Sequence, residues 1–569
     1  MVKLCYFLKN NLVIGLLLFC GIVFSIGIAQ LHLFDLDELY FAEITREMMV
    51  TGKYRQVQFN FEPLYEKPPL FFWIQALSMW LWGVNEWGAR FPNILCGVLT
   101  LASLYHIGKK YKGKRFGILW ACLYVTSFLP HFYFKSALID PFFNYFSFLS
   151  IYFLSAARGS TTQSSLLAGL FMGMAMLTKG PIGVFVPFCT ILLHMLSEMA
   201  KTQLSGCLLA LWRLLAISRK LLGATAIAIF IGACWLIPEI ASNGLVFIKE
   251  FWHYHLLLYQ SPVDTHTHGW YYHLLVLFWG CFPSSFFGLL GFKQKKLAQK
   301  DELLTHMQCL FMVVLLTFTL VGTKIVHYSS MAYFPITFFA AHFFDLPIAT
   351  HRPIPRWIPF LFLAFGMVIA LGLLLMPWMM LHKERWICWV NNPNVRFALD
   401  LPVLWSYWDS MPGVVYAIGL GVSFYYLLRC RLVLFIGLSM VVHMGSLTLF
   451  LSHIGPKIEA YVQKELVDFC KACSGQEVYL VTVGFKAAAP LFYANKPLEK
   501  GLKEQDLPWL LAGAIDKPCF YIIYKSDKEQ MKPYPTITHL KDSGCFSFYQ
   551  RLPATDNEGL LYRGYCKAL

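Results

Sequence analysis

Long apolar runs recur along most of this chain and constrain its fold more than any other feature. Hydrophobic residues make up 57% of the 569 residues and charged residues only 14%, and the mean hydropathy is +0.54. A helix needs roughly 20 apolar residues to cross the hydrocarbon core of a bilayer. The runs therefore predict an all-α polytopic membrane protein with about 13 transmembrane helices, at residues 12–30, 87–108, 116–132, 139–157, 163–178, 181–197, 220–238, 270–292, 303–321, 326–344, 356–378, 411–428 and 432–452.

Lysine and arginine residues set the expected orientation of these helices. The chain has 47 of them against 32 acidic residues. In a polytopic protein such an excess marks cytoplasmic loops rather than a nucleic-acid-binding surface. With the N-terminus in the cytoplasm, alternate loops are basic, and the clearest is residues 109–115. The opposite, exterior face then receives residues 31–86, 133–138, 179–180, 239–269, 322–325, 379–410 and the tail from His453.

The first exterior loop carries two segments that are expected to lie at the membrane surface. Residues 37–48 would place Tyr40, Ile44 and Met48 on one side of a helix. Residues 68–82 are too short for a span and begin with two prolines, which favours a re-entrant or interfacial helix. Residues 37–48 allow two interpretations: an interfacial helix with a solvated acidic face, or part of a site that uses its carboxylates.

The tail after residue 452 changes in character. Residues 478–483, 519–524 and 546–549 are short apolar runs typical of buried strands, with turn or helical segments between them. We therefore predict a transmembrane domain over residues 1–452 and a small exterior α/β domain over residues 453–569.

Charged residues that are costly near lipid gather at the exterior face of this predicted topology. They are Asp37, Glu38, Lys67, Asp140, Lys179 and Lys324. Lysines that reach toward the interface and solvated acids would explain each of them singly. This ordinary explanation fits poorly for Asp140, which has no charged neighbour in the sequence, and for the set taken together.

Acids and lysines at one membrane depth suit the transfer of a group from a lipid phosphate. The lysines would hold the phosphate and stabilise charge on the departing oxygen. Because the phosphate leaves without being protonated, one carboxylate is enough as general base for the acceptor hydroxyl, unlike the pair of acids in a glycosidase. We expect Asp37 to be this base and Asp140 to orient it or share its role, with Lys67, Lys179 and Lys324 at the phosphate.

These motifs follow one another in an order that resembles one known family. They are Asp37-Glu38, Ala42-Glu43-Ile44, Arg46-Glu47-Met48, Glu66-Lys67-Pro68, Ile139-Asp140, Lys179-Gly180-Pro181 and Lys324-x-x-His327-Tyr328. Over roughly residues 10 to 450 the chain resembles the GT-C membrane glycosyltransferases of the protein mannosyltransferase class, and within it the bacterial aminoarabinose transferases of lipid A. The resemblance implies a GT-C fold and an inverting glycosyltransferase of the bacterial inner membrane. It would move a sugar from a polyprenyl (undecaprenyl) phosphate to a lipid A-type glycolipid or a protein hydroxyl at the periplasmic face.

The resemblance also implies roles for single residues. Asp37 matches the catalytic aspartate of the family, Asp140 its second acid, and Lys67 a lysine that contacts the lipid phosphate. The other positions expected around the substrates are Glu38, Lys179, His255, Lys324 and Tyr328. The chain departs from the family pattern where the family has an acid or an arginine and this sequence has Tyr40, Tyr254 and Leu258.

Two groups of residues raise the question of a metal. Cys470 and Cys473 form a C-x-x-C pair, but no second pair at zinc-ligand spacing accompanies it, and a disulfide there would need an oxidising compartment. The other group is the histidines of one exterior loop and the helix after it: His253, His255, His266, His268 and His273. Histidines of an aromatic-rich interfacial loop are the simpler explanation, so no residue is assigned to a metal, while a divalent ion near the first aspartate stays an alternative.

Two other functions remain open. A transporter or flippase for lipid-linked sugars would carry charges deep in the membrane, broken helices and inverted repeats. A non-catalytic scaffold would tolerate loss of the carboxylates. The ionisable residues gather at one face and no repeat is evident, which favours the transferase.

Overall fold

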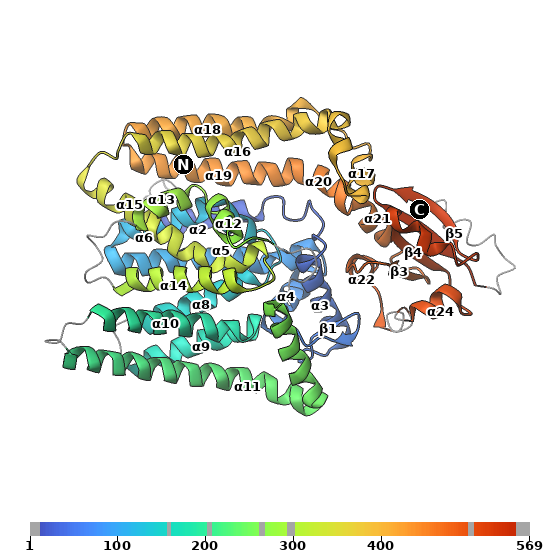
Figure 1. Ribbon diagram of the computed structural model, residues 1–569, viewed down its shortest axis with the longest axis horizontal. Coiled ribbons are helices and arrows are strands. Elements are labelled where there is room, and N and C mark those ends of the chain that lie inside the picture. Colours follow the sequence, from blue (N-terminus) through green and yellow to red (C-terminus); the bar gives the residue numbers. More distant parts are fainter. Residues whose placement is uncertain are drawn as a thin grey trace.

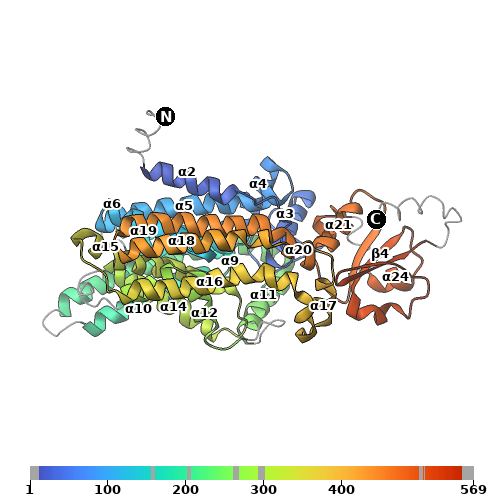
Figure 2. The same ribbon diagram turned by 90° about the horizontal axis from the view of Figure 1, so that it is seen from above.

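The helices form an elongated bundle, and a small sheet domain lies at one end of it in both views (Figures 1 and 2). The computed structural model describes residues 12–155, 161–201, 207–260, 268–292, 302–498, 504 and 506–553. Figure 1 shows the sheet domain, in red, beyond the ends of the long helices.

A helix, or a pair of short ones, occupies every range predicted to cross the membrane. The helices are α2 (Leu12–Ser25), α5 (Glu86–Lys112), α6 (Lys114–Thr126), α7 (Phe128–Tyr133), α8 (Asp140–Ser155), α9 (Thr161–Lys179), α10 (Ile182–Lys201), α11 (Cys207–Gln260), α12 (Tyr272–Gly280), α13 (Ser284–Phe292), α14 (Glu302–Leu320), η3 (Val326–Ala332), α15 (Tyr333–Thr350), α16 (Trp357–Leu381), α18 (Met411–Leu428) and α19 (Leu432–Leu449). Within the described residues, eight helices are long and apolar enough to cross a membrane, or up to nine if the bent pair α12 and α13 is one span. The prediction of a polytopic helical membrane protein is confirmed.

Several of the remaining predicted spans carry polar residues that lie inside the bundle. Helix α8 has 16 residues and buries Asn144, Ser147 and Ser150 inside the bundle. Of these, Asn144 donates a hydrogen bond to the Ser330 hydroxyl of η3 at 2.8 Å. Polar side chains lower the mean hydropathy of the helix that carries them. The apolar run at residues 139–157 nevertheless located this helix.

Small residues bring neighbouring helices into close contact. A Cβ atom added to Gly108 of α5 would lie 2.7 Å from the Cα of Gly117 in α6. A Cβ added to Gly169 of α9 would lie 2.6 Å from the Cβ of Ile227 in α11. Without a hydrophobic driving force between helices in lipid, such close backbone packing contributes much of the attraction that holds a bundle together.

The loop after α2, predicted to be exterior, folds into α3 (Asp37–Thr51), a short hairpin of β1 (Gln58–Phe59) and β2 (Glu62–Pro63), and α4 (Leu70–Trp82). Both predicted helices are present. The idea of a solvated acidic face on α3 is wrong, because Glu38, Glu43 and Glu47 are all buried. Arg46 is buried too, and its guanidinium contacts both oxygens of Glu43 at 2.6 and 2.7 Å. Most of α3 is therefore enclosed by protein, and Glu43 and Arg46 form an ion pair inside the fold.

Short connecting elements complete the end of the bundle that adjoins the C-terminal domain. They are η4 (Lys383–Arg385), η5 (Ile387–Trp389), α17 (Pro393–Leu399), η6 (Tyr407–Ser410) and the π-helical turn η7 (Phe450–Ile454). The turn η7 joins α19 directly to α20 (Gly455–Val462), so helical structure continues across residues 452 and 453. The division into domains at that point stays a prediction.

The C-terminal domain is a four-stranded sheet with short helices. After α20 it contains α21 (Lys464–Ala472), β3 (Tyr479–Val483), α22 (Ala489–Phe492), α24 (Leu507–Ala512), β4 (Cys519–Tyr524), η8 (Lys525–Met531), β5 (Thr538–Ser543) and β6 (Phe546–Arg551). The strand order is β3-β4-β6-β5, with β3 parallel to β4 and the other pairs antiparallel. The three predicted strands are present. The sequence missed β5 because this edge strand is polar and largely exposed, so it has no apolar run to mark it.

Candidate active site

A cavity of about 410 Å³ is lined by residues at the ends of the helices and by residues of the C-terminal domain. Segments from the N-terminal part of the chain to this domain contribute to its wall. The lining residues are Asp35, Leu36, Asp37, Tyr40, Phe41, Phe59, Lys67, Ile139, Asp140, Lys179, Tyr254, Thr323, Ile325, His327, Tyr328, Lys486, Ala487 and Ala488. Five residues predicted for the site line this cavity together: Asp37, Lys67, Asp140, Lys179 and Tyr328.

The two aspartates of the cavity differ in exposure and in partners. The Asp140 side chain is 4% exposed, and its Oδ1 accepts a hydrogen bond from Lys179 Nζ at 2.5 Å. The Asp37 side chain is 43% exposed, and its Oδ2 lies 3.5 Å from His327 Nε2. The same nitrogen of His327 lies 3.7 Å from Asp140 Oδ2, so the imidazole stands between the two carboxylates. Asp37 is the carboxylate that a substrate can reach, whereas Asp140 is held by neighbouring cations.

Aromatic rings position Lys67 and Lys179, the two cavity lysines that the sequence predicted for the site. Lys67 donates a hydrogen bond to the Tyr254 hydroxyl at 3.1 Å and lies 5.0 Å from the centre of that ring. Lys179 lies 5.0 Å from the centre of the Tyr328 ring. A cation over an aromatic face is stabilised by the ring quadrupole, so both ammonium groups have a defined place in the cavity.

Glu66 places a carboxyl group next to Lys67. Burial raises the pKa of the Glu66 carboxyl, while the charge of Lys67 and a hydrogen bond from Tyr254 act in the opposite direction. Tyr254 therefore contacts both members of the Glu66-Lys67 pair. In the sequence, Tyr254 was identified only as a position where the chain differs from the family pattern, and no contact was predicted for it.

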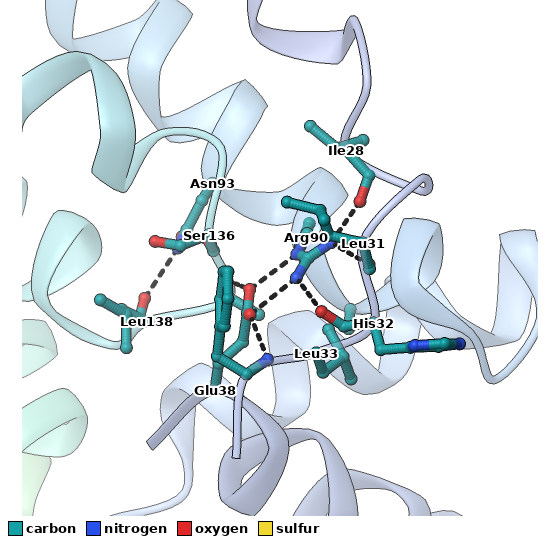
Figure 3. A network of polar contacts seen from close by, with 12 residues as sticks. Ile28, Leu31, His32, Leu33, Glu38, Arg90, Asn93, Ser136 and Leu138 are labelled. Carbon is teal, nitrogen blue, oxygen red and sulfur yellow. Dashed lines mark hydrogen bonds and ion pairs between the residues drawn. The ribbon is translucent and has the colours of Figure 1, made fainter. Parts of the chain in front are cut away.

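Glu38 does not line the cavity. Figure 3 shows its carboxylate facing the Arg90 guanidinium, which donates to both oxygens at 2.7 and 2.8 Å. Arg90 also donates to the backbone carbonyls of Ile28, Leu31 and His32. The carboxylate of Glu38 further accepts the backbone N–H of Ala137 at 2.7 Å. This network fixes the chain that leads into α3, so Glu38 supports the site from behind.

A neighbouring contact fixes the segment that leads to Asp140. In Figure 3, Asn93 of α5 donates to the carbonyls of Ser136 and Leu138, the latter at 2.8 Å. Asp140 then begins α8. An acidic residue in the first turn of a helix interacts favourably with the helix dipole, which gives this buried carboxylate a further source of stabilisation.

Lys324 and His255 lie near the cavity without lining it. Lys324 is buried and donates to the carbonyls of Thr319 and Val321 at the end of α14, at 2.9 and 3.0 Å. His255 Nδ1 lies 2.7 Å from the Phe251 carbonyl, and its Nε2 faces the Gly180 backbone. Lys324 thus closes a helix end beside the cavity wall, and His255 packs behind the turn that follows Lys179.

The backbone just before Asp37 is strained. Leu36 has φ +104° and ψ −131°, a region that costs a non-glycine residue roughly 1–3 kcal/mol and persists only where the surroundings hold it. Hydrogen bonds on both sides do so here. Phe34 and Leu36 accept from the backbone N–H groups of Leu39 and Tyr40, each at 3.0 Å. The strained residue directs Asp37 into the first turn of α3 at the cavity wall.

The C-terminal domain and the short helices that lead into it hold the segment of residues 32–35. The bonds are His32 N–H to Glu459 Oε1 (3.0 Å), Leu33 N–H to the Tyr493 hydroxyl (2.7 Å), Asp35 N–H to Gln463 Oε1 (2.9 Å), Gln463 Nε2 to the Leu33 carbonyl (3.0 Å) and Ala488 N–H to Asp35 Oδ1 (3.4 Å). These contacts join residues more than 400 positions apart in the sequence. The tail is therefore part of the structure that positions Asp37.

Within the described parts of the chain, no group of three or more His, Cys, Asp and Glu side chains could hold a metal ion. His266 lies outside these residues. His268 stacks on Tyr272, and His273 Nδ1 lies 3.1 Å from the Ser329 hydroxyl. Cys470 and Cys473 are free thiols, and both are buried.

Known proteins of one functional class resemble this chain in sequence. The family model described as Dolichyl-phosphate-mannose-protein mannosyltransferase matches residues 66–222. The undecaprenyl phosphate-alpha-4-amino-4-deoxy-L-arabinose arabinosyl transferase of Erwinia tasmaniensis is 26% identical over 383 residues, which cover 64% of this chain and 65% of that protein. The protein of the same name from Pectobacterium carotovorum is 26% identical over 349 residues, covering 59% and 60%. The matches span just under two thirds of these relatives.

Solved structures resemble the chain over nearly its whole length. ArnT from Cupriavidus metallidurans bound to undecaprenyl phosphate superposes with a TM-score of 0.75 at 17% identity, covering 95% of this chain and 98% of that one. The apo form of the same protein gives 0.74 at 16% identity, covering 95% and 97%. At this level of identity the likeness concerns the fold, and the predicted GT-C fold with a small C-terminal sheet domain is confirmed.

Proposed function

We propose that this chain, a multi-pass GT-C membrane protein related to the aminoarabinose transferases and protein mannosyltransferases, is an inverting glycosyltransferase. Its donor would be a sugar linked to a polyprenyl phosphate, undecaprenyl phosphate in a bacterial inner membrane. Two relatives are named as arabinosyl transferases for an undecaprenyl phosphate-linked sugar, and an ArnT structure holds undecaprenyl phosphate. The acceptor would be a lipid A-type glycolipid or, as the alternative, a protein hydroxyl.

One observation carries this proposal: an accessible carboxylate shares a cavity with two positioned lysines. Asp37 is 43% exposed and lines the same wall as Lys67 and Lys179. A phosphate-linked donor needs cations at the leaving group and a base at the acceptor. A cavity with both at one membrane face meets these needs.

The proposed reaction moves one sugar and one proton. The acceptor oxygen attacks the anomeric carbon from the side opposite the phosphate, and Asp37 takes the proton of the acceptor hydroxyl as the new C–O bond forms. The bond between the anomeric carbon and the phosphate oxygen breaks, and its electron pair leaves with the phosphate. Lys67 and Lys179 stabilise the charge that develops there. Attack from the opposite side inverts the configuration at the anomeric carbon.

Asp140 and His327 would orient this machinery. Asp140 is almost fully buried and hydrogen-bonded to Lys179, so it can hold that ammonium group at the leaving phosphate. His327 lies between Asp140 and Asp37 and would fix the direction of the Asp37 carboxylate. We assign both residues to positioning, and Tyr328 to the wall that faces the Lys179 side chain.

The cavity would open at the periplasmic face. The basic loop of residues 109–115 joins α5 and α6, and the segment with Asp37 and Lys67 lies at the other end of α5. Basic loops mark the cytoplasmic side of a membrane protein, so the Asp37 end faces outward. The charged residues of the cavity sit at this one end of the bundle, which speaks against a transporter with charges at the mid-membrane level.

A reconstituted transfer assay tests the function. The purified protein in liposomes would receive radiolabelled sugars on undecaprenyl phosphate together with lipid A or an acceptor peptide. Label should move to one acceptor class, and the anomeric configuration of the product, read by nuclear magnetic resonance, should be inverted relative to the donor. Transfer with retained configuration would overturn the inverting mechanism. Binding of the donors without transfer to either acceptor class would favour a transporter or a scaffold.

A further inference from the structure

We propose that Lys486 of the C-terminal domain binds an anionic group, a phosphate or a carboxylate, on the head of a glycolipid acceptor. The inference rests on the proposed function and assigns a task to the C-terminal domain within it. Lys486 lines the same cavity as Asp37 and Asp140, although it lies 449 and 346 positions away from them in the sequence. The acceptor site is thus completed by a residue from the other end of the chain.

The segment that carries Lys486 is fixed on both sides. Strand β3 ends at Val483, and Gly484 turns the chain with φ +81°. Phe485 then packs on the ring of Tyr524, with ring centres 4.4 Å apart. After Lys486, the backbone N–H of Ala488 donates to Asp35 Oδ1 at 3.4 Å. The backbone at Lys486 is therefore held against the cavity by the sheet on one side and by the Asp37 loop on the other.

The charge of Lys486 is available to a ligand. Lys67 is hydrogen-bonded to Tyr254, and Lys179 to Asp140. In the described part of the chain Lys486 makes no hydrogen bond or ion pair, and its side chain is exposed. Its charge acts at longer range on Glu66, where it lowers the pKa of the carboxyl. Of the three lysines that line the cavity, it is the one whose ammonium group keeps all its donors free.

The position of Lys486 favours the acceptor over the donor. The C-terminal domain lies beyond the ends of the helices in both views (Figures 1 and 2). Lys486 follows β3 in this domain and lines the cavity, so it contributes from outside the helical bundle. A polyprenyl donor enters from the membrane, and its phosphate would meet Lys67 and Lys179 first. An ammonium group on a flexible stem binds a phosphate or carboxylate as a point charge. The group that fits here is one on the head of the second substrate.

A lipid acceptor agrees with the surface beside the cavity. Helix α4 follows Lys67 in the chain and exposes the large apolar side chains of Leu77, Trp80 and Leu81. Aromatic and aliphatic residues exposed together in this way are typical of a protein surface in contact with the membrane interface. An acceptor could keep its acyl chains in the bilayer against such a surface while its charged head enters the cavity that Lys486 lines.

The test compares Lys486→Ala with Lys486→Arg, and with Lys532→Ala as the matched control. Lys532 is an exposed lysine of the same domain whose ammonium group pairs with its neighbour Glu529. In the transfer assay with lipid A, Lys486→Ala should raise the KM for lipid A about three- to tenfold, as expected for one partly screened charge contact. The KM for the donor and kcat should stay near the wild-type values, and Lys486→Arg should restore the KM for lipid A.

A binding measurement keeps this proposal separate from the transfer reaction. Wild-type protein in detergent should bind lipid A in the absence of donor, and Lys486→Ala should bind it about three- to tenfold more weakly. An unchanged KM and affinity for lipid A in Lys486→Ala would overturn the proposal, as would a change in the donor KM alone. Preferred transfer to a peptide would overturn the lipid acceptor. If wild type binds lipid A through Lys486 and transfers nothing, the proposed function fails while the site stands.

Discussion

Tyr254 belongs to α11 and contacts Lys67 across a gap of 187 positions in the sequence. This contact could not be predicted from the sequence, since no local pattern links Tyr254 to the segment that carries Lys67. It recorded only that a tyrosine stands where the related family has an acid. In the fold, the phenol supports the same Glu66-Lys67 pair through its hydroxyl and its ring face. In this chain the tyrosine therefore makes a polar contact to the lysine.

Removing the Tyr254 hydroxyl should weaken donor binding. Tyr254→Phe keeps the ring under Lys67 and deletes the hydrogen bond, which is worth about 1–2 kcal/mol for a charged, partly buried donor. The KM for the polyprenyl-phosphate donor should rise roughly five- to thirtyfold, with a smaller change in kcat. Steady-state kinetics in liposomes would measure both. Tyr271→Phe alters an exposed tyrosine of the same exterior region and should change neither value.

Glu47 should make the stability of the protein depend on pH. Burial and the neighbouring Glu43 raise the pKa of the Glu47 carboxyl to about 8. Because the folded state binds a proton more tightly than the unfolded state, stability is greatest below the unfolded pKa near 4.5 and falls as the pH rises toward 8. Glu47→Gln keeps the oxygen that accepts the Phe61 N–H and cannot ionise.

Melting temperatures of the detergent-solubilised protein between pH 5 and 8 would check this dependence. The wild-type melting temperature should fall across this range more steeply than that of Glu47→Gln. Glu62→Gln changes an exposed acid of the same loop and should leave the wild-type slope intact. Parallel curves for wild type and Glu47→Gln would contradict the assignment.

At the scale of elements, the apolar runs predicted the positions of the helices well. The environment of the acidic segment at residues 37–48 was predicted poorly. Each predicted span holds helical structure. A long apolar run marks a segment that lipid can surround, and such a segment must satisfy its backbone hydrogen bonds within itself, which a helix does. Helix α3 was located correctly, but its charges read as surface charges, since their partners Arg90 and Asn495 lie elsewhere in the chain. Strand β5 was not predicted, because it has no apolar face. Local sequence patterns predict where helices and strands lie, but they do not predict which elements pack against each other.

The C-terminal domain should influence catalysis through Gln463, which bonds to Leu33 and Asp35 just before the strained Leu36. Gln463→Ala removes both contacts and frees the loop that aims Asp37. We expect kcat to fall about three- to tenfold, since each lost hydrogen bond costs roughly 0.5–1.5 kcal/mol, while the KM for the donor changes little.

The matched control is Gln476→Ala, in the turn after α21. Gln476 Nε2 donates to the nearby Ala472 carbonyl, a contact confined to that turn. Steady-state transfer rates at saturating donor would separate the two variants. Equal kcat values for Gln463→Ala and wild type would mean that the tail does not position Asp37.

At the scale of the whole molecule, the cavity joins two parts that the sequence presents as separate. The predicted division near residue 452 treats the tail as an independent unit, yet residues 459–493 hold the Asp37 loop and Lys486 lines the cavity. Contacts between segments more than 400 positions apart cannot be inferred from one sequence. The shared depth of Asp37, Asp140, Lys67 and Lys179 could be predicted, because alternating loop charge fixes the side of each loop.

Labelling of single cysteines in a variant without the native cysteines would test the orientation. Lys532→Cys lies in the C-terminal domain, and Lys110→Cys lies in the basic last turn of α5. In spheroplasts, a membrane-impermeant maleimide should label position 532 and should reach position 110 only after the membrane is disrupted. The reverse pattern would put the cavity in the cytoplasm and would exclude a periplasmic acceptor.

The most direct test of the central claim is the transfer rate of Asp37→Asn. The amide keeps the size of the side chain and cannot take the acceptor proton, and loss of a general base typically costs about 10²–10⁴-fold in rate. We predict a loss of this size in kcat with donor affinity close to that of wild type, while Asp400→Asn, at an exposed aspartate of a different exterior loop, keeps full activity. Transfer by Asp37→Asn at the wild-type rate would contradict the assignment of this carboxylate as the base.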